Sequence, residues 1–249
     1  MSVPQRIERP HSPAPVSELV LVDQHEAQGW RVRRDERLDQ LFEQRCDWID
    51  RYGRADRPAV DSDELSLTYA ELDARANQLA RYLRLRGAGG GDRIALLFDG
   101  AAHSYVAMLA VLKIGATYVP LDVASPTGRL AYIVEDARAH TVLSMSRVAE
   151  TVPQIELLTA SGAELVYLDR AARLIEEMNP HRLLDADRGT CDNPLAYISY
   201  AAVSGRPEGV AIDHASICNF VKVAAETYRF RPADRVYQGM AIAFDFSVE

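Results

Sequence analysis

One stretch of the sequence combines residue types that could bind phosphate. Residues 195–214 read LAYISYAAVSGRPEGVAIDH, with an apolar run on each side of a short loop. A loop that grips phosphate needs hydroxyls, free backbone N–H groups and a cation. The candidates for those roles are Ser204, Gly205, Arg206 and Gly209. Glu208 stands among them with the wrong charge, so the stretch predicts either a weakened phosphate loop or an ordinary strand–loop–strand connection.

The residues before this loop alternate between helical and strand patterns. A helix is expected over 38–52, and a better-marked helix over 67–87 carries a Thr68/Glu71 capping box. A further helix with Tyr105, Met108, Leu109 and Leu112 on one stripe follows the first buried strand. Apolar runs typical of buried strands lie at 92–98, 115–121, 140–145 and 164–169.

Helix caps mark the later elements. Ser125 is expected to cap a helix with Pro126 at its first position, and Asp213 to cap the last clear helix. Residues 171–193 are polar and predict a connector. Strands that alternate with helices indicate an α/β fold with mostly parallel sheets and helices on both faces.

Composition narrows the function. The net charge of −8 over 249 residues argues against nucleic acid as a partner. Two basic runs, 31–37 and 81–87, are interpreted as solvated helix faces. Scattered histidines predict no metal site, and the apolar run 19–22 is too short to span a membrane. Three separated cysteines, Cys46, Cys191 and Cys218, fit a reducing compartment, so we expect a cytoplasmic protein.

Four motifs resemble, in order and spacing, the core motifs of adenylate-forming ligases, and especially the amino-acid adenylation domains of nonribosomal peptide synthetases. They lie at 67–83, 111–137, 195–214 and 242–249. The resemblance implies the large N-terminal domain of that family. It implies a partial AMP-binding domain over 37–249, after a mobile, proline-containing leader over 1–36.

The family resemblance also implies a reaction. An amino acid and ATP, with Mg²⁺, give an aminoacyl-adenylate and pyrophosphate. A carboxylate nucleophile is already ionised, so catalysis consists of positioning and charge neutralisation. No catalytic residue is assigned within this sequence.

The phosphate loop departs from the family pattern Y-T-S-G-S-T-G-x-P-K-G-V. Here Tyr200 to Val210 read Y-A-A-V-S-G-R-P-E-G-V, one residue shorter, with Val203 at a glycine position and Glu208 at the lysine position. Replacing attraction by repulsion about 4 Å from a phosphate charge costs roughly 2–8 kcal/mol. ATP affinity weaker than millimolar is therefore expected.

The end of the sequence resembles the motif that opens the amino-acid pocket. In the family, the aspartate at the position of Asp245 holds the substrate α-ammonium, and an alternative is that it caps a helix. The expected substrate-binding residues are Phe244, Asp245, Phe246 and Glu249. The Glu249 carboxylate favours a basic amino acid such as lysine or ornithine, although a solvated Glu249 without a role is an equal alternative.

We expect the chain alone to be a truncated, inactive fragment. A carrier protein or a missing C-terminal half acting in trans is its expected partner. The alternatives are a non-catalytic α/β binding or interaction module and, more weakly, an acyl-CoA synthetase fragment. Apolar surface around Ile242, Phe244 and Phe246 is expected to be exposed and to promote self-association.

Overall fold

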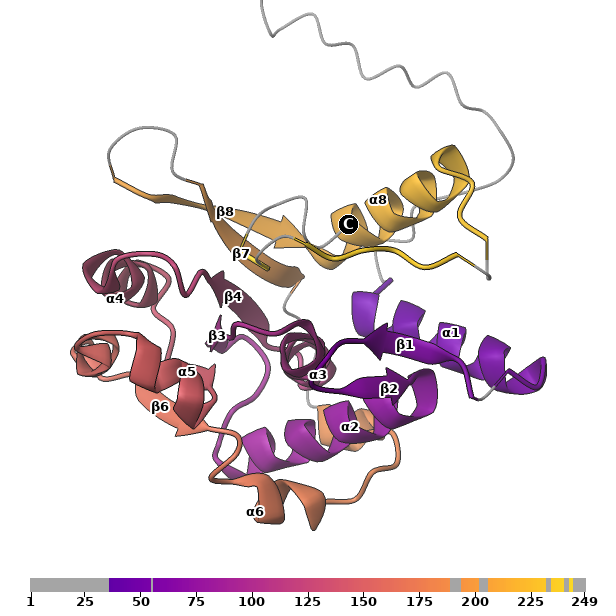
Figure 1. Ribbon diagram of the computed structural model, residues 1–249, viewed down its shortest axis with the longest axis horizontal. Coiled ribbons are helices and arrows are strands. Elements are labelled where there is room, and N and C mark those ends of the chain that lie inside the picture. Colours follow the sequence, from indigo (N-terminus) through magenta and orange to yellow (C-terminus); the bar gives the residue numbers. More distant parts are fainter. Residues whose placement is uncertain are drawn as a thin grey trace, which may run out of the picture. The chain divides into compact units, whose positions relative to one another are not determined.

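A computed structural model describes residues 36–54, 56–188, 194–201, 206–231, 234–239 and 242–243. A six-stranded sheet in the order β6-β5-β3-β4-β7-β8 forms its centre (Figure 1). The strands are β3 (Arg93–Leu97), β4 (Thr117–Leu121), β5 (Thr141–Ser144), β6 (Glu164–Tyr167), β7 (Leu195–Ala201) and β8 (Glu208–Asp213). All neighbours run parallel except β7 and β8, which are antiparallel. The predicted α/β class and mostly parallel sheet are confirmed.

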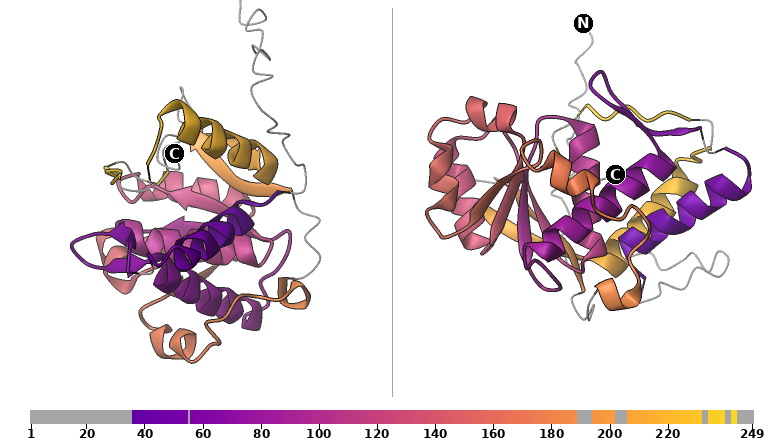
Figure 2. Two further views of the ribbon diagram at one scale, coloured as in Figure 1. Left: turned by 90° about the vertical axis from the view of Figure 1, so that its right-hand side faces the viewer. Right: turned by 90° about the horizontal axis from the view of Figure 1, so that it is seen from below.

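Helices cover both faces of this sheet (Figure 2). The longer ones are α1 (Leu38–Arg51), α2 (Tyr69–Leu85), α3 (Ala101–Lys113), α4 (Thr127–Asp136) and α8 (His214–Thr227). Short helices are α5 (Ser146–Thr151), the 3₁₀ helix η2 (Ile155–Thr159), α6 (Ala172–Glu176) and α7 (Asp185–Arg188). Strands β1 (Pro58–Asp61) and β2 (Ser66–Thr68), which the sequence did not predict, form a separate antiparallel pair.

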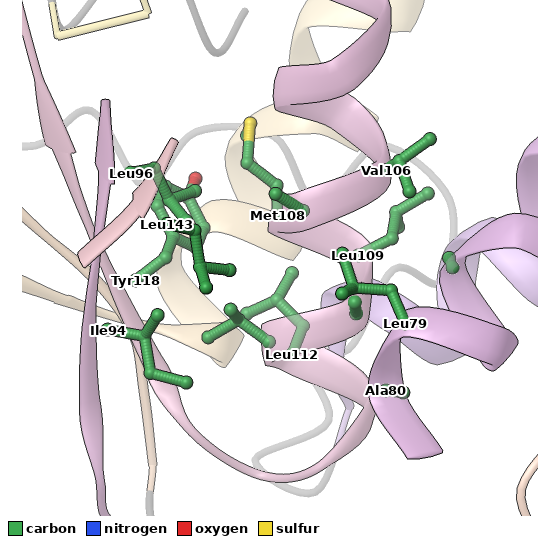
Figure 3. Close-up of a cluster of buried hydrophobic side chains, with 14 of the residues drawn as sticks. Leu79, Ala80, Ile94, Leu96, Val106, Met108, Leu109, Leu112, Tyr118 and Leu143 are labelled. Atoms are coloured by element: carbon green, nitrogen blue, oxygen red, sulfur yellow. The ribbon is translucent and has the colours of Figure 1, made fainter. Parts of the chain in front are cut away.

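Two cores follow from the alternation of side chains along each strand. On β3, Ile94 and Leu96 face the core that α2 and α3 complete, as Figure 3 shows. Ala95 and Leu97 face the second core, which combines side chains of β4, β5 and β7 with those of α4, α5 and η2. Strand β4, which β7 joins, is buried along its whole length.

Two of the predicted helix caps, Thr68/Glu71 and Asp213, are confirmed. Thr68 and Glu71 form the capping box that starts α2, and the Asp213 carboxylate accepts the Ser216 N–H at 2.7 Å to start α8. The predicted Ser125 cap is wrong. Its backbone N–H closes a turn onto the Asp122 carbonyl, and Pro126 takes the cap position with an extended ψ of 139°.

The interpretation of the two basic runs, 31–37 and 81–87, as solvated helix faces is wrong for one arginine in each run. Arg81 donates to the backbone carbonyls of Asn179, His181 and Arg182, at 2.8, 2.5 and 3.1 Å. It thereby fastens the predicted connector, which contains the short helices α6 and α7, to the side of α2. Arg37 is buried, and its guanidinium donates to the Leu112 carbonyl at 2.9 Å.

Arg37 also begins a series of ion pairs with alternating charge, here called the ion-pair chain. It links α1, α2, the C-terminus of α3, α7 and the segment just before α7. In order its members are Arg37, Asp39, Arg188, Glu43, Lys113, Asp73, Arg182 and Asp47. Lys113 is fully buried in the middle and lies 2.8 Å from the Asp73 carboxylate. Each interior charge thus has an opposite charge on both sides.

The expected exposure around the last motif is not seen at its first residue, because Ile242 is only 7% exposed and packs into the α2–α3 core. Exposed apolar side chains instead gather on α8 and just after it. They are Phe220, Val223, Tyr228, Phe230, Val236 and Tyr237. No helix among the described residues is long and apolar enough to cross a membrane.

Candidate functional site

The candidate phosphate loop connects the two strands at one side of the sheet. Strand β7 is buried between β4 and β8, whereas the first residues of β8 are exposed. Tyr200 pairs with Gly209, and Ala201 pairs with Glu208. Ser204 and Gly205 lie outside the described residues, so their predicted phosphate contacts stay predictions. Arg206, Glu208 and Gly209 are described.

Gly209 has a structural reason to be glycine. A Cβ atom at this position would lie 2.8 Å from Cζ and 3.0 Å from the hydroxyl oxygen of Tyr200, and 3.1 Å from a methyl group of Ile198. A Cβ atom here would force the Tyr200 ring to shift, so Gly209 leaves the room in which this ring crosses the strand pair. The described contacts of Gly209 are with these side chains.

The Tyr200 hydroxyl reaches across to α4. It donates a hydrogen bond to Asp136 Oδ2 at 2.8 Å, and the Tyr132 hydroxyl donates to Asp136 Oδ1 at 3.0 Å. Burial, and then the Asp136 carboxylate, raise the pKa of Tyr200. The pKa of Tyr132 is raised by desolvation and by its hydrogen bond to the same carboxylate. Both phenols therefore stay protonated donors at neutral pH.

Arg206 lies over the ring of Tyr132, which together with Asp136 and Tyr200 is here called the platform. The guanidinium carbon is 4.5 Å from the centroid of the Tyr132 ring, a cation–π contact. The residue is exposed, and none of the described carboxylates forms an ion pair with it. Such stacking fixes the flat guanidinium while leaving N–H donors for an anion.

Glu208 is the first residue of β8 and is exposed. It forms no ion pair within the described part of the chain. Water therefore screens its charge, and its repulsion of a phosphate falls near the lower end of the expected range.

The predicted amino-acid pocket is not described. Phe244, Asp245, Phe246 and Glu249 all lie outside the described residues, so their roles stay predictions. Across the described ranges, no group of three or more His, Cys, Asp or Glu side chains is arranged to hold a metal ion.

Sequence reasoning missed Tyr132 and Asp136. Their spacing of four residues places them on one side of α4, which was the available signal for a contact between them. Nothing in the sequence showed that Tyr200, 64 residues further along, would meet the same carboxylate.

His214, the first residue of α8, contacts the start of α1 beside the ion-pair chain. Its Nδ1 accepts the backbone N–H of Leu38 at 3.1 Å, and its buried Nε2 has no hydrogen-bond partner among the residues that the structure describes. Burial, and then the nearby Arg37 charge, lower the pKa of His214 to about 3. The imidazole is therefore neutral in the folded protein.

Comparison with known proteins places this geometry in a family. A family profile described as AMP-binding enzyme matches residues 47–249. The chain is 34% identical over 213 residues to tyrocidine synthase 3 of Brevibacillus parabrevis, covering 85% of this chain and 3% of that protein. It is also 36% identical over 182 residues to gramicidin S synthase 2 of Brevibacillus brevis, covering 72% and 4%.

Solved structures agree with these relatives. The nonribosomal peptide synthetase FmoA3 in its AMPPNP-bound form superposes with a TM-score of 0.72 at 27% identity, over 87% of this chain and 21% of that one. ATP-bound MatB from Rhodopseudomonas palustris gives 0.70 at 25% identity, over 84% and 42%. The chain thus spans under half the length of each of these four proteins. It belongs to the AMP-binding enzyme family, and the resemblance of its motifs to nonribosomal peptide synthetase adenylation domains is confirmed.

Proposed function

We propose that residues 37–249 are the N-terminal part of an amino-acid adenylation domain, with the β7–β8 loop as a weakened phosphate-binding loop. The reaction of such a domain joins an amino acid to the α-phosphate of ATP and releases pyrophosphate. The observation that carries the proposal is the exposed guanidinium of Arg206 at the root of this loop, in a chain of the AMP-binding enzyme family. None of the described carboxylates forms an ion pair with it.

The described residues fit a phosphate group only in part. Arg206 offers N–H donors, while Glu208 places a negative charge where the family pattern has lysine. ATP, with Mg²⁺ on its phosphates, would supply the electrophilic phosphorus. This chain's residues would hold and orient the phosphates, and no residue would need to remove a proton from the amino-acid carboxylate.

The substrate proposal rests on the last motif. The Asp245 carboxylate would hold the α-ammonium of an amino acid, with Phe244 and Phe246 beside it. Glu249 would favour a basic side chain, because a desolvated carboxylate needs a cation. In the synthetases that share this family, a carrier protein would be the partner that receives the activated amino acid.

Glu208 also favours a second candidate function, that of a non-catalytic module that keeps the fold but no longer binds ATP. On this second proposal, the purified chain shows no amino-acid-dependent exchange of pyrophosphate into ATP. Robust exchange with any amino acid would rule it out.

One titration tests whether the β7–β8 loop is a phosphate site. Calorimetry with ATP and Mg²⁺ would compare the chain with its Glu208→Lys and Glu208→Gln variants. Removing a screened repulsion and adding an attraction is worth about 2 kcal/mol, so Glu208→Lys should tighten binding roughly 30-fold, with Glu208→Gln intermediate.

The matched control is Glu150→Lys, which reverses an exposed charge on α5. It should leave the affinity within about twofold, because distant exposed charges are screened. If neither Glu208 variant binds ATP more tightly than the control, the loop is not a phosphate site and the first proposal fails.

A further inference from the structure

The proposed phosphate loop lacks its lysine, which raises the question of what supplies its positive charge. We infer that Arg206 is the phosphate-binding cation of the β7–β8 loop and that Tyr132, fixed by Asp136, is its positioning residue. The inference rests on the proposed function of this loop and adds the residues that make it work.

The platform under Arg206 is firmly held. Helix α4 carries Leu130, Ile133 and Val134 on its inner side, and all three are at most 4% exposed. Tyr132 stands on the same helix, half-buried, with its ring under the guanidinium. A cation stacked on this ring is therefore tied to the core of the protein rather than to the loop alone.

Asp136 holds the Tyr132 ring in place. Its two carboxylate oxygens each accept a phenolic hydroxyl, one from Tyr132 and one from Tyr200. Arg206 stacks on the face of the Tyr132 ring, and among the described ion pairs none joins it to Asp136. Cation–π stacking holds the side chain and leaves most of its N–H donors available to an anion.

The position of Arg206 suits a substitute for lysine. It is two residues before Glu208, where β8 begins, and three before Gly209. Guanidinium binds phosphate oxygens through paired N–H donors, which makes arginine a competent replacement for an ammonium group.

The test uses the full 249-residue chain carrying Glu208→Gln, which removes the repulsive charge without adding a second cation. Inorganic tripolyphosphate is the probe, with calorimetry at low salt. Adding Arg206→Ala should weaken binding about tenfold or more, the usual effect of losing a charge-assisted hydrogen bond. Adding Tyr132→Leu should weaken it about three-fold, because the stacking contact is lost. Tyr132→Phe keeps the ring and should restore most of that loss.

A double variant separates positioning from a general structural effect. If Tyr132 acts through Arg206, then Tyr132→Leu should cause no further loss once Arg206 is alanine. The matched control is Arg45→Ala, which removes another exposed arginine whose guanidinium lies 4.4 Å over an aromatic ring, that of Trp48, on α1. It should leave the affinity unchanged.

Three results would overturn the inference. Binding that is insensitive to Arg206→Ala would show that another group is the cation, with the proposed function intact. An equal loss from Tyr132→Leu with or without Arg206 would show that Tyr132 only supports the fold. Failure of the Glu208→Gln chain itself to bind tripolyphosphate would remove the phosphate site and this inference together.

Discussion

The ion-pair chain and the β7–β8 loop treat charged side chains in opposite ways. In the ion-pair chain, Lys113 is fully buried and contacts the carboxylates of Glu43 and Asp73. In the loop, Arg206 and Glu208 are exposed and form no ion pair with another described residue. A buried charge without a partner costs several kcal/mol, whereas water stabilises an exposed one. The buried charges of the ion-pair chain therefore neutralise one another, whereas the exposed charges of the loop remain accessible to a ligand.

The largest effect is expected from breaking the ion-pair chain at its centre. Lys113→Met would leave Glu43 and Asp73 without their shared cation. The free energy of unfolding should fall by about 3–5 kcal/mol, as for other buried pairs that lose one partner. Urea denaturation followed by circular dichroism measures this loss.

The control for that variant is Arg173→Met. Arg173 pairs with Glu177 on the surface, and its side chain is 92% exposed. Its loss should change stability by less than about 0.5 kcal/mol. Equal decreases in the free energy of unfolding of the two variants would contradict the proposed difference between buried and exposed charges.

A pH titration of stability examines His214, which accepts the Leu38 N–H beside the ion-pair chain. The unfolded chain protonates this histidine below about pH 6.5, but the folded chain keeps it neutral down to about pH 3. The unfolded state therefore binds more protons between these values, so stability decreases as the pH falls. Between pH 6.5 and 4.5 the His214 contribution should decrease by about 2–3 kcal/mol.

The variant for this test is His214→Asn, whose amide oxygen can still accept the Leu38 N–H but does not titrate. The difference in unfolding free energy between the two proteins should shrink or reverse in favour of the variant as the pH falls. Parallel curves for the two proteins would mean that His214 does not carry the effect.

A smaller effect is expected in the loop region from Gly209→Ala. The new methyl group would force the Tyr200 ring away from Asp136, and the overpacking should cost about 1–2 kcal/mol. The Tyr200→Ala variant lacks the ring that clashes with the new methyl group. Gly209→Ala introduced into that variant should therefore cost less than half of what it costs in the native chain. An unchanged cost in that background would show that the glycine is needed for its backbone rather than for the ring.

The local features of the fold were predictable, while long-range polar contacts were not. The Thr68/Glu71 box and the Asp213 cap join residues three apart, so the chain itself carries the signal. Arg188 reaches Asp39 across 149 residues, and no pattern in the sequence specifies that contact. For the same reason Arg37 was mistaken for a solvated residue.

The candidate site divides in the same way. The loop, its departures from the family pattern and the role proposed for Arg206 could be found from the motif alone. The platform that holds Arg206 could not, because Tyr132, Asp136 and Tyr200 meet only when α4 packs beside β7. A glycine that the motif assigns to phosphate binding was found to be fitted to a tyrosine ring as well.

The place of β7 beside β4 has a consequence for how the protein assembles. Strands β3 to β6 each pair with a strand close by in the sequence, but β7 meets β4 after a separation of 78 residues between Thr117 and Leu195. Contacts across long loops are slow to form, because chain entropy is lost before they stabilise anything. We expect the β7–β8 hairpin to dock onto the sheet last during folding. Pulse-labelled hydrogen exchange should show the amides of β3 and β4 protected before those of β7, and simultaneous protection would contradict this order.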